Sequence, residues 1–137
     1  MVIELNTTPK EYIIDEILYQ WDDMRNSYSK ISYYAVTEII QMMFDTILPD
    51  DLAVNVELED DYTLDLFGFA QLTDNSGPVK VYTSNINVPD YSDITDQEGN
   101  EENAVKLWEF FLDRVITPTT QGVNETTDKL YSIFNEK

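Results

Sequence analysis

Apolar residues recur at helical spacing in two segments near the N-terminus. Residues 10–26 follow a three-to-four-residue apolar period, which predicts an amphipathic helix, and Thr8 and Pro9 form a typical helix start. Residues 33–48 have the same period with a broader apolar face, and Pro49 predicts the end of this second helix. Because that face is so wide, we expect a sheet to cover one side and another helix or a partner to cover the other.

After Pro49 the apolar period changes from helical to twofold. Residues 52–58 alternate between apolar and polar, as do residues 62–66 and 79–83, with turn-forming residues at 59–61 and 74–77. This pattern predicts an antiparallel meander of three strands, or of four if residues 85–88 form a separate strand. Gly68 predicts a bulge at which Phe67 and Phe69 switch faces.

The C-terminal half returns to helical spacing. Residues 89–103 are polar and acidic and predict a long exposed loop, and a third helix is expected over 104–115, ending before Pro118. The threonine-rich residues 117–120 are expected to be extended or a loop, followed by a short closing helix. The fold class is therefore α+β: one acidic domain, residues 1–137, in which three main helices and a short C-terminal helix pack on one face of the meander.

The charge of the chain is strongly one-sided. Asp and Glu number 27 against 8 Lys and Arg, a formal net charge of -19, and between Asp50 and Glu102 the only base is Lys80. With 42% apolar and 12% aromatic residues, the chain is unlike disordered acidic sequences. Dense like charge opposes folding, and a basic partner surface offsets that cost. The same charge argues against binding nucleic acid or anionic membranes, which both attract cations.

The residues that most catalysis and metal binding need are missing. The chain has no His and no Cys, which removes the commonest general base and the usual zinc and iron ligands. Its four glycines are isolated, so no phosphate-binding loop is present. Residues 93–101 gather oxygen ligands around Gly99, but Ile94 stands where an EF-hand requires an acid. We therefore expect no enzyme, no cofactor and no dedicated metal site.

The acidic residues of the first strand have a defined geometry. Glu57 and Glu59 are two residues apart, so they lie on one strand face roughly 6.5–7 Å apart, and the row continues towards Asp61. This spacing is comparable to that of successive phosphates on one nucleic-acid strand. Tyr91 adds an aromatic side chain in a loop that offers little core to enter. The candidate partner-contact residues are Asp50, Asp51, Glu57, Glu59, Asp60, Asp61, Tyr91, Asp93, Asp96 and Glu98.

These features predict a non-enzymatic protein that binds a basic protein surface. The sharpest form of this hypothesis is a virus-encoded inhibitor that mimics nucleic acid and occupies the basic surface of a nucleic-acid-binding or defence protein. The alternative is a structural component of a viral particle or other large assembly, in which the broad second helix and an extended segment 117–123 contact neighbours or further copies. A regulatory or chaperone-like adaptor for a basic client is a third reading. The N-terminal residues lack the pattern of a signal peptide, which favours the cytoplasm, or the virion under the alternative.

Overall fold

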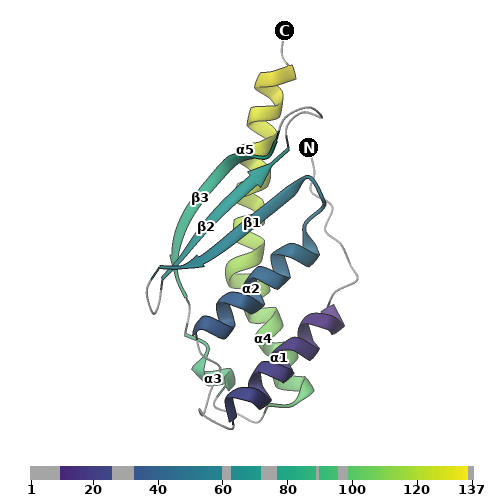
Figure 1. Cartoon of the computed structure of the whole chain (residues 1–137), viewed down its shortest axis with the longest axis vertical. Helices are drawn as coiled ribbons and strands as arrows, with labels where there is room; N and C mark the ends of the chain where they lie inside the picture. The colour runs from purple at the N-terminus through teal and green to yellow at the C-terminus, as the bar shows by residue number, and fades with distance from the viewer. Residues whose placement is uncertain are drawn as a thin grey trace.

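Three antiparallel strands form one sheet, and helices pack on one of its faces (Figure 1). The computed structural model describes residues 10–25, 33–59, 63–71, 77–88, 90–95 and 99–135. Its elements, in chain order, are α1 (Lys10–Arg25), α2 (Tyr33–Ile47), β1 (Leu52–Leu58), β2 (Thr63–Ala70), β3 (Val79–Asn87), α3 (Ser92–Thr95), α4 (Glu101–Phe111), the π-helix η1 (Leu112–Ile116) and α5 (Thr117–Asn135). The predicted α+β class is confirmed.

The sheet is the predicted meander, with strand order β1-β2-β3. Residues 85–87 do not form a separate fourth strand. They continue β3, because Ile86 pairs with Leu64 and Asn87 with Thr63, so the β2–β3 ladder extends to the first residue of β2. The apolar residues of β1 and β2 alternate as the sequence predicts, and Val54, Leu64 and Leu66 are fully buried on the inner face.

The predicted bulge lies opposite Gly68, but it acts on β3. Gly68 pairs with Tyr82 and Phe69 pairs with Lys80, which leaves Val81 as the extra residue. An extra residue shifts the alternation only in the strand that contains it. Phe67 and Phe69 therefore stay on the same face of β2, between inner-face residues that are buried, and the expected switch of these two phenylalanines is wrong.

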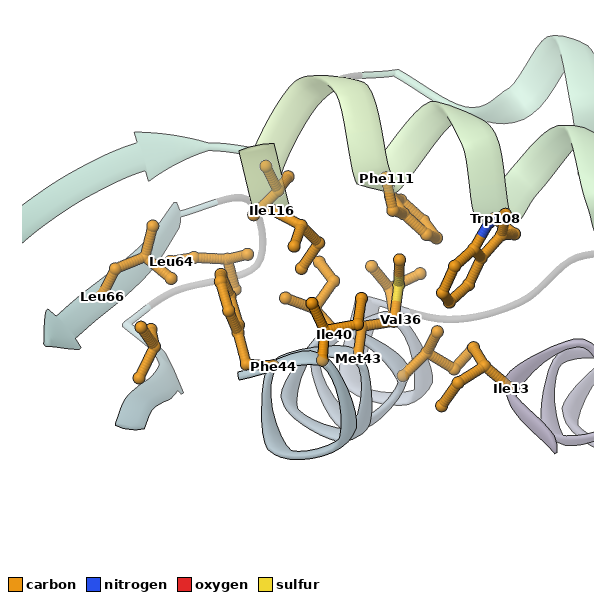
Figure 2. Close-up of a cluster of buried hydrophobic side chains, with 14 of the residues drawn as sticks. Ile13, Val36, Ile40, Met43, Phe44, Leu64, Leu66, Trp108, Phe111 and Ile116 are labelled. Carbon is orange, nitrogen blue, oxygen red and sulfur yellow. The ribbon is translucent and has the colours of Figure 1, made fainter. Parts of the chain in front are cut away.

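The hydrophobic core lies between α2, the inner face of the sheet and the α4–η1 segment. Figure 2 shows Ile40, Met43 and Phe44 of α2 next to Leu64 of β2 and Ile116 of η1, and all five side chains are fully buried. α2 also contacts α1 and η1, and Figure 1 shows α2 between the sheet and α1. The predicted coverage of α2 on two sides is thus confirmed, and it is supplied by this same chain.

The C-terminal helices are joined, which corrects the predicted break at residues 117–120. α4 passes through the π-helix η1 directly into α5, as one long rod in Figure 1. Pro118 has no N–H to donate and normally ends a helix. Here the preceding turn is widened, and the Thr117 N–H bonds to the Leu112 carbonyl five residues back. Pro118 then falls in the first turn of α5, where a missing donor is tolerated.

Two glycines set the close approach between α5 and the sheet. A Cβ atom built on Gly68 would lie 2.6 Å from Cγ2 of Val123, and one built on Gly122 would lie 2.5 Å from Cε2 of Tyr82. Each glycine thus receives a side chain of the opposite element. This contact fixes α5 against the inner face of β2 and β3 and leaves the outer face of the sheet open.

The segment predicted as a long acidic loop is partly helical. Residues 92–95 form α3, which packs on α4, and α4 already begins at Glu101. Asn100 caps α4, because its side-chain oxygen accepts a hydrogen bond from the Asn103 N–H at 2.9 Å.

In the part of the chain that the structure describes, no helix has the length and apolar content needed to cross a bilayer.

Candidate functional site

The outer face of the sheet is the candidate site, because the described helices leave it uncovered. Its side chains alternate with the buried inner-face residues and are exposed in β1 and half-buried in β2. The strand register arranges them in rows across the sheet, and three of these rows include all three strands: Glu57–Asp65–Asn85, Asn55–Phe67–Thr83 and Ala53–Phe69–Lys80. One end of this open sheet face is therefore acidic and the other is aromatic.

The acidic end consists of Glu57, Glu59 and Asp65. Glu57 and Asp65 face each other across neighbouring strands, and Glu59 follows Glu57 on the same side of β1. Strands lie about 4.8 Å apart and alternate residues about 7 Å apart, so the three side chains start within roughly 5–7 Å of their neighbours. Like charges at this separation destabilise a sheet unless a cation offsets them. No described Lys or Arg forms an ion pair with any of the three.

Asn85 holds two of these carboxylates in place. Its side-chain Nδ2 donates to Oε2 of Glu59 at 2.7 Å and to Oδ1 of Asp65 at 2.7 Å. The side chain of Glu59 thus reaches across β2 to a residue of β3. Because both hydrogen bonds order the carboxylates before any partner arrives, binding costs less side-chain entropy. Asn85 adds no charge, so the end of the face remains fully anionic.

The aromatic end consists of Phe67, Phe69 and Lys80. Both phenylalanines are half-buried on the outer face of β2, and Nζ of Lys80 lies 5.4 Å from the ring centroid of Phe67. This cation–π contact places the only base of residues 50–102 over an aromatic ring. Aromatic side chains beside a charged rim are the usual anchors of protein interfaces.

The predicted contact residues are distributed over three places. Glu57 and Glu59 lie together on the open sheet face, as the strand alternation predicts. Asp50 and Asp51 are exposed in the turn before β1, and the seven residues of β1 place them roughly 20 Å from Glu57. Asp93 is exposed on α3, next to α4. These residues therefore do not form one continuous acidic patch.

Tyr91 corrects the expectation that its loop offers no core. Its side chain is only 3% exposed, and its ring meets that of Phe111 edge-on at 6.0 Å between centroids. It anchors the segment before α3 to α4, so its ring is not an exposed partner contact. The remaining candidates, Asp60, Asp61, Asp96 and Glu98, lie outside the described residues.

Five members of the site were not among the predicted contacts: Asp65, Asn85, Phe67, Phe69 and Lys80. Their alternation within each strand is visible in the sequence, but their neighbours depend on register. A signal was present for Asp65, because it alternates with the apolar Leu64 and Leu66 and so belongs to the outer face of β2, where the register pairs it with Glu57. Asn85 carried no such signal, since the bulge at Val81 shifts the pairing of β3 by one residue.

The edge of the sheet next to this face is blocked at its centre. Nε2 of Gln41, on α2, donates to the Val54 carbonyl at 2.8 Å, and Oε1 of Gln41 accepts from the Val56 N–H at 2.8 Å. The glutamine amide thus takes the place of a neighbouring strand along β1. An exposed strand edge invites pairing with other chains, and the Gln41 amide occupies that position at the centre of β1.

Among the helical residues whose burial the structure describes, three tyrosines are exposed: Tyr12 (58%) and Tyr19 (63%) on α1, and Tyr34 (66%) on α2. Tyr34 lies one turn before Glu38, and the hydrogen bond from its hydroxyl to the Glu38 carboxylate raises the pKa of Tyr34 above its usual 10.0. The negative charge of Glu38 adds to this effect because it repels the phenolate.

We expect Tyr34 to ionise at a higher pH than it does in a Glu38→Gln variant. Because the folded-state pKa is raised, the stabilisation from this pair is present below about pH 10 and is lost as the pH rises through the raised value. An NMR titration of the Tyr34 ring, assigned by its loss in Tyr34→Phe, measures both midpoints. Equal midpoints in the two proteins would show that Glu38 does not act on Tyr34.

The open sheet face combines carboxylates ordered by Asn85 with half-buried phenylalanine rings. Within residues 10–25, 33–59, 63–71, 77–88, 90–95 and 99–135, no group of three or more acidic side chains has an arrangement that could hold a metal ion. No protein-family model, curated protein or solved structure matches this chain.

Proposed function

We propose that this protein is a non-enzymatic binding protein whose open sheet face docks on a basic protein surface. In its sharpest form it is a virus-encoded inhibitor that mimics nucleic acid and occupies the phosphate-binding surface of a nucleic-acid-binding or defence protein. The observation that carries the proposal is the group of Glu57, Glu59 and Asp65, which Asn85 holds and with which no described Lys or Arg forms an ion pair.

The acidic end and the aromatic end of the open sheet face contribute to binding in different ways. The -19 net charge attracts a basic partner from a distance and raises the association rate. The ordered carboxylates then pair with Lys or Arg side chains that otherwise contact phosphates, and Phe67 and Phe69 bury apolar area, which slows dissociation. Competition follows directly, because the partner's cations cannot contact this protein and a nucleic acid at the same time.

Two segments had favoured a structural component of an assembly, the broad apolar face of α2 and residues 117–123, and both pack against other parts of this chain. The apolar face of α2 is covered by the sheet and by neighbouring helices. Its apolar residues between Val36 and Phe44 are part of the hydrophobic core. Residues 117–123 form the start of α5, with Thr119, Thr120 and Val123 buried. Among the described residues, Tyr34 is the large apolar side chain that remains exposed on α2, and residues 117–123 are helical, so these two segments give the assembly hypothesis less support.

The proposal is tested by displacement of DNA from a basic ligand. A labelled 20-base-pair duplex is bound to a deca-arginine peptide, this protein is added, and release of the duplex is followed by fluorescence anisotropy. We expect release at about 50 mM salt and a steep loss of release by about 300 mM, as for any competition between charged surfaces. Release that does not change with salt, or no release at 50 mM, would contradict the proposal.

A further inference from the structure

A groove runs between α1 and the first turns of α4, well separated in sequence from the sheet. It encloses about 280 Å³ and is lined by Glu11, Ile14, Asp15, Leu18, Glu101 and Val105. A shallower depression over Glu101, Glu102, Val105 and Lys106 continues it along α4. The two helices are in direct contact, so the groove is part of the packed structure.

The groove has an apolar floor and an acidic rim. Ile14 is buried at its base, and Leu18 and Val105 are partly buried and pack against the core. The rim carries three exposed carboxylates, those of Glu11, Asp15 and Glu101. None of the three forms an ion pair with a described residue. Lys106, the base nearest along α4, already pairs with Glu102 at 3.8 Å.

Helical spacing explains how α1 builds its wall. Residues 11, 14, 15 and 18 are three or four apart and share one face of the helix. Asp15 is also three residues after Tyr12 and four before Tyr19, so both exposed tyrosines stand beside the acidic rim. Two tyrosine side chains with more than half of their surface exposed provide rigid contact area next to the groove.

We propose that this groove is a subsite for one basic side chain, an arginine or lysine, of a partner protein. The aliphatic stem of such a side chain lies on Ile14, Leu18 and Val105, and its cationic head meets the carboxylates of Glu11, Asp15 and Glu101. The inference rests on the proposed function in one respect, that the partner is a basic protein. It concerns a separate surface.

The chemistry of the groove selects this occupant. An apolar ligand would contact the apolar floor of the groove but leave the three carboxylates at the rim without a cation. A compact cation would pair with the carboxylates but leave the apolar floor exposed to water. Arginine and lysine carry both parts, because their stems bury on apolar surface while their charged ends stay at the edge. Guanidinium also pairs with carboxylates through two parallel hydrogen bonds, which makes arginine the better fit.

The test uses n-butylguanidinium as an arginine side-chain probe on the whole protein. Methyl resonances of Ile14, Leu18 and Val105 are followed by NMR at constant ionic strength. We expect saturable shifts with a dissociation constant of roughly 1–10 mM, typical for so small a ligand. Guanidinium, which lacks the stem, and n-butanol, which lacks the charge, are expected to shift these methyl groups at least about fivefold less at equal concentration.

Variants locate the binding. The pair Glu11→Gln and Asp15→Asn is expected to weaken n-butylguanidinium binding roughly tenfold, the loss of about 1.4 kcal/mol of charge pairing. The matched pair Asp113→Asn and Glu125→Gln removes the same charge from exposed positions on η1 and α5 and is expected to change binding less than about twofold. Equal weakening by both pairs, or equal shifts from guanidinium and n-butylguanidinium, would overturn the subsite.

The outcome is separable from that of the proposed function. If n-butylguanidinium binds as expected but no DNA is displaced from the arginine peptide, the subsite stands and the proposed function fails. If displacement occurs but the three methyl groups do not respond, the subsite fails alone. Neutralising Glu57, Glu59 and Asp65 together is expected to leave n-butylguanidinium binding unchanged, since these residues lie on the sheet.

Discussion

Neutralising Glu57, Glu59 and Asp65 together, as Glu57→Gln, Glu59→Gln and Asp65→Asn, is expected to weaken binding to deca-arginine roughly 100-fold at low salt. Each carboxylate is expected to contribute about 1 kcal/mol to an interface with a cation, and about 1.4 kcal/mol corresponds to a factor of ten. The three act as a unit, because Asn85 orders Glu59 and Asp65 and the register places Glu57 beside Asp65. Fluorescence anisotropy of labelled deca-arginine measures the change.

A second triple variant separates the local site from the net charge. Glu109→Gln, Asp113→Asn and Glu125→Gln also remove three charges, but from exposed positions on α4, η1 and α5. At about 0.1 M salt the Debye length is about 10 Å, so these distant charges are largely screened. We expect them to change the affinity less than about threefold. Equal losses in the two variants would mean that only the overall charge matters, and the open sheet face would lose its role.

The first triple variant is also expected to remain folded. Glu57, Glu59 and Asp65 repel one another, so replacing them with amides removes an unfavourable interaction. The amide oxygens that replace the two carboxylates bonded to Asn85 still accept hydrogen bonds from it. Thermal unfolding therefore serves as the check: an unchanged or higher midpoint, together with lost binding, assigns the loss to the surface.

Gly68→Ala is expected to lower the free energy of unfolding by about 1–3 kcal/mol, the usual cost of overpacking a core. The new methyl group would lie 2.6 Å from Cγ2 of Val123 and 3.0 Å from Cβ of Tyr82. Neither neighbour is a flexible chain end: Val123 is fully buried in α5, and the Cβ of Tyr82 is held by the backbone of β3. α5 must therefore move away from the sheet, and urea unfolding measures the resulting loss in the free energy of unfolding.

Two further variants test that explanation. Gly77→Ala adds the same methyl group where nothing lies within 4 Å, so a change of less than about 0.5 kcal/mol is expected. Val123→Ala removes the atom that Gly68→Ala would strike. The double variant is therefore expected to lose less stability than the sum of the two single variants. Strict additivity would show that the contact between Gly68 and Val123 is not the cause.

The elements with a strong local period were predictable from the sequence. α1, α2 and the three strands follow from apolar spacing alone, because each spacing matches the geometry of one kind of secondary structure. The C-terminal half was less predictable. Pro118 predicts a helix end, but whether the chain stops or continues depends on the turn before it, and here a π-helical turn makes room for the proline. Local propensity does not determine that outcome.

Burial of single aromatic residues was also beyond local pattern. Tyr91 stands in a polar, acidic stretch, so its neighbours in sequence predict exposure. It is buried because the α3 segment packs on α4 and presents Phe111 to its ring. For the broad face of α2, coverage by the sheet was predicted, but the sequence left open whether a helix or a partner covers the other side, and α1 and η1 make those contacts.

The sequence by itself determined the charge of the molecule, its lack of His and Cys, and the strand alternation that places Glu57 and Glu59 on one face. These properties depend on composition and on spacing within a single strand. Tertiary structure alone decided which residues join them: the pairing of β2 with both neighbours adds Asp65 and Asn85. Asp50 lies before the other end of β1, so the length of the strand separates it from Glu57. The reason is that register and packing are contacts between distant segments, which no local period encodes.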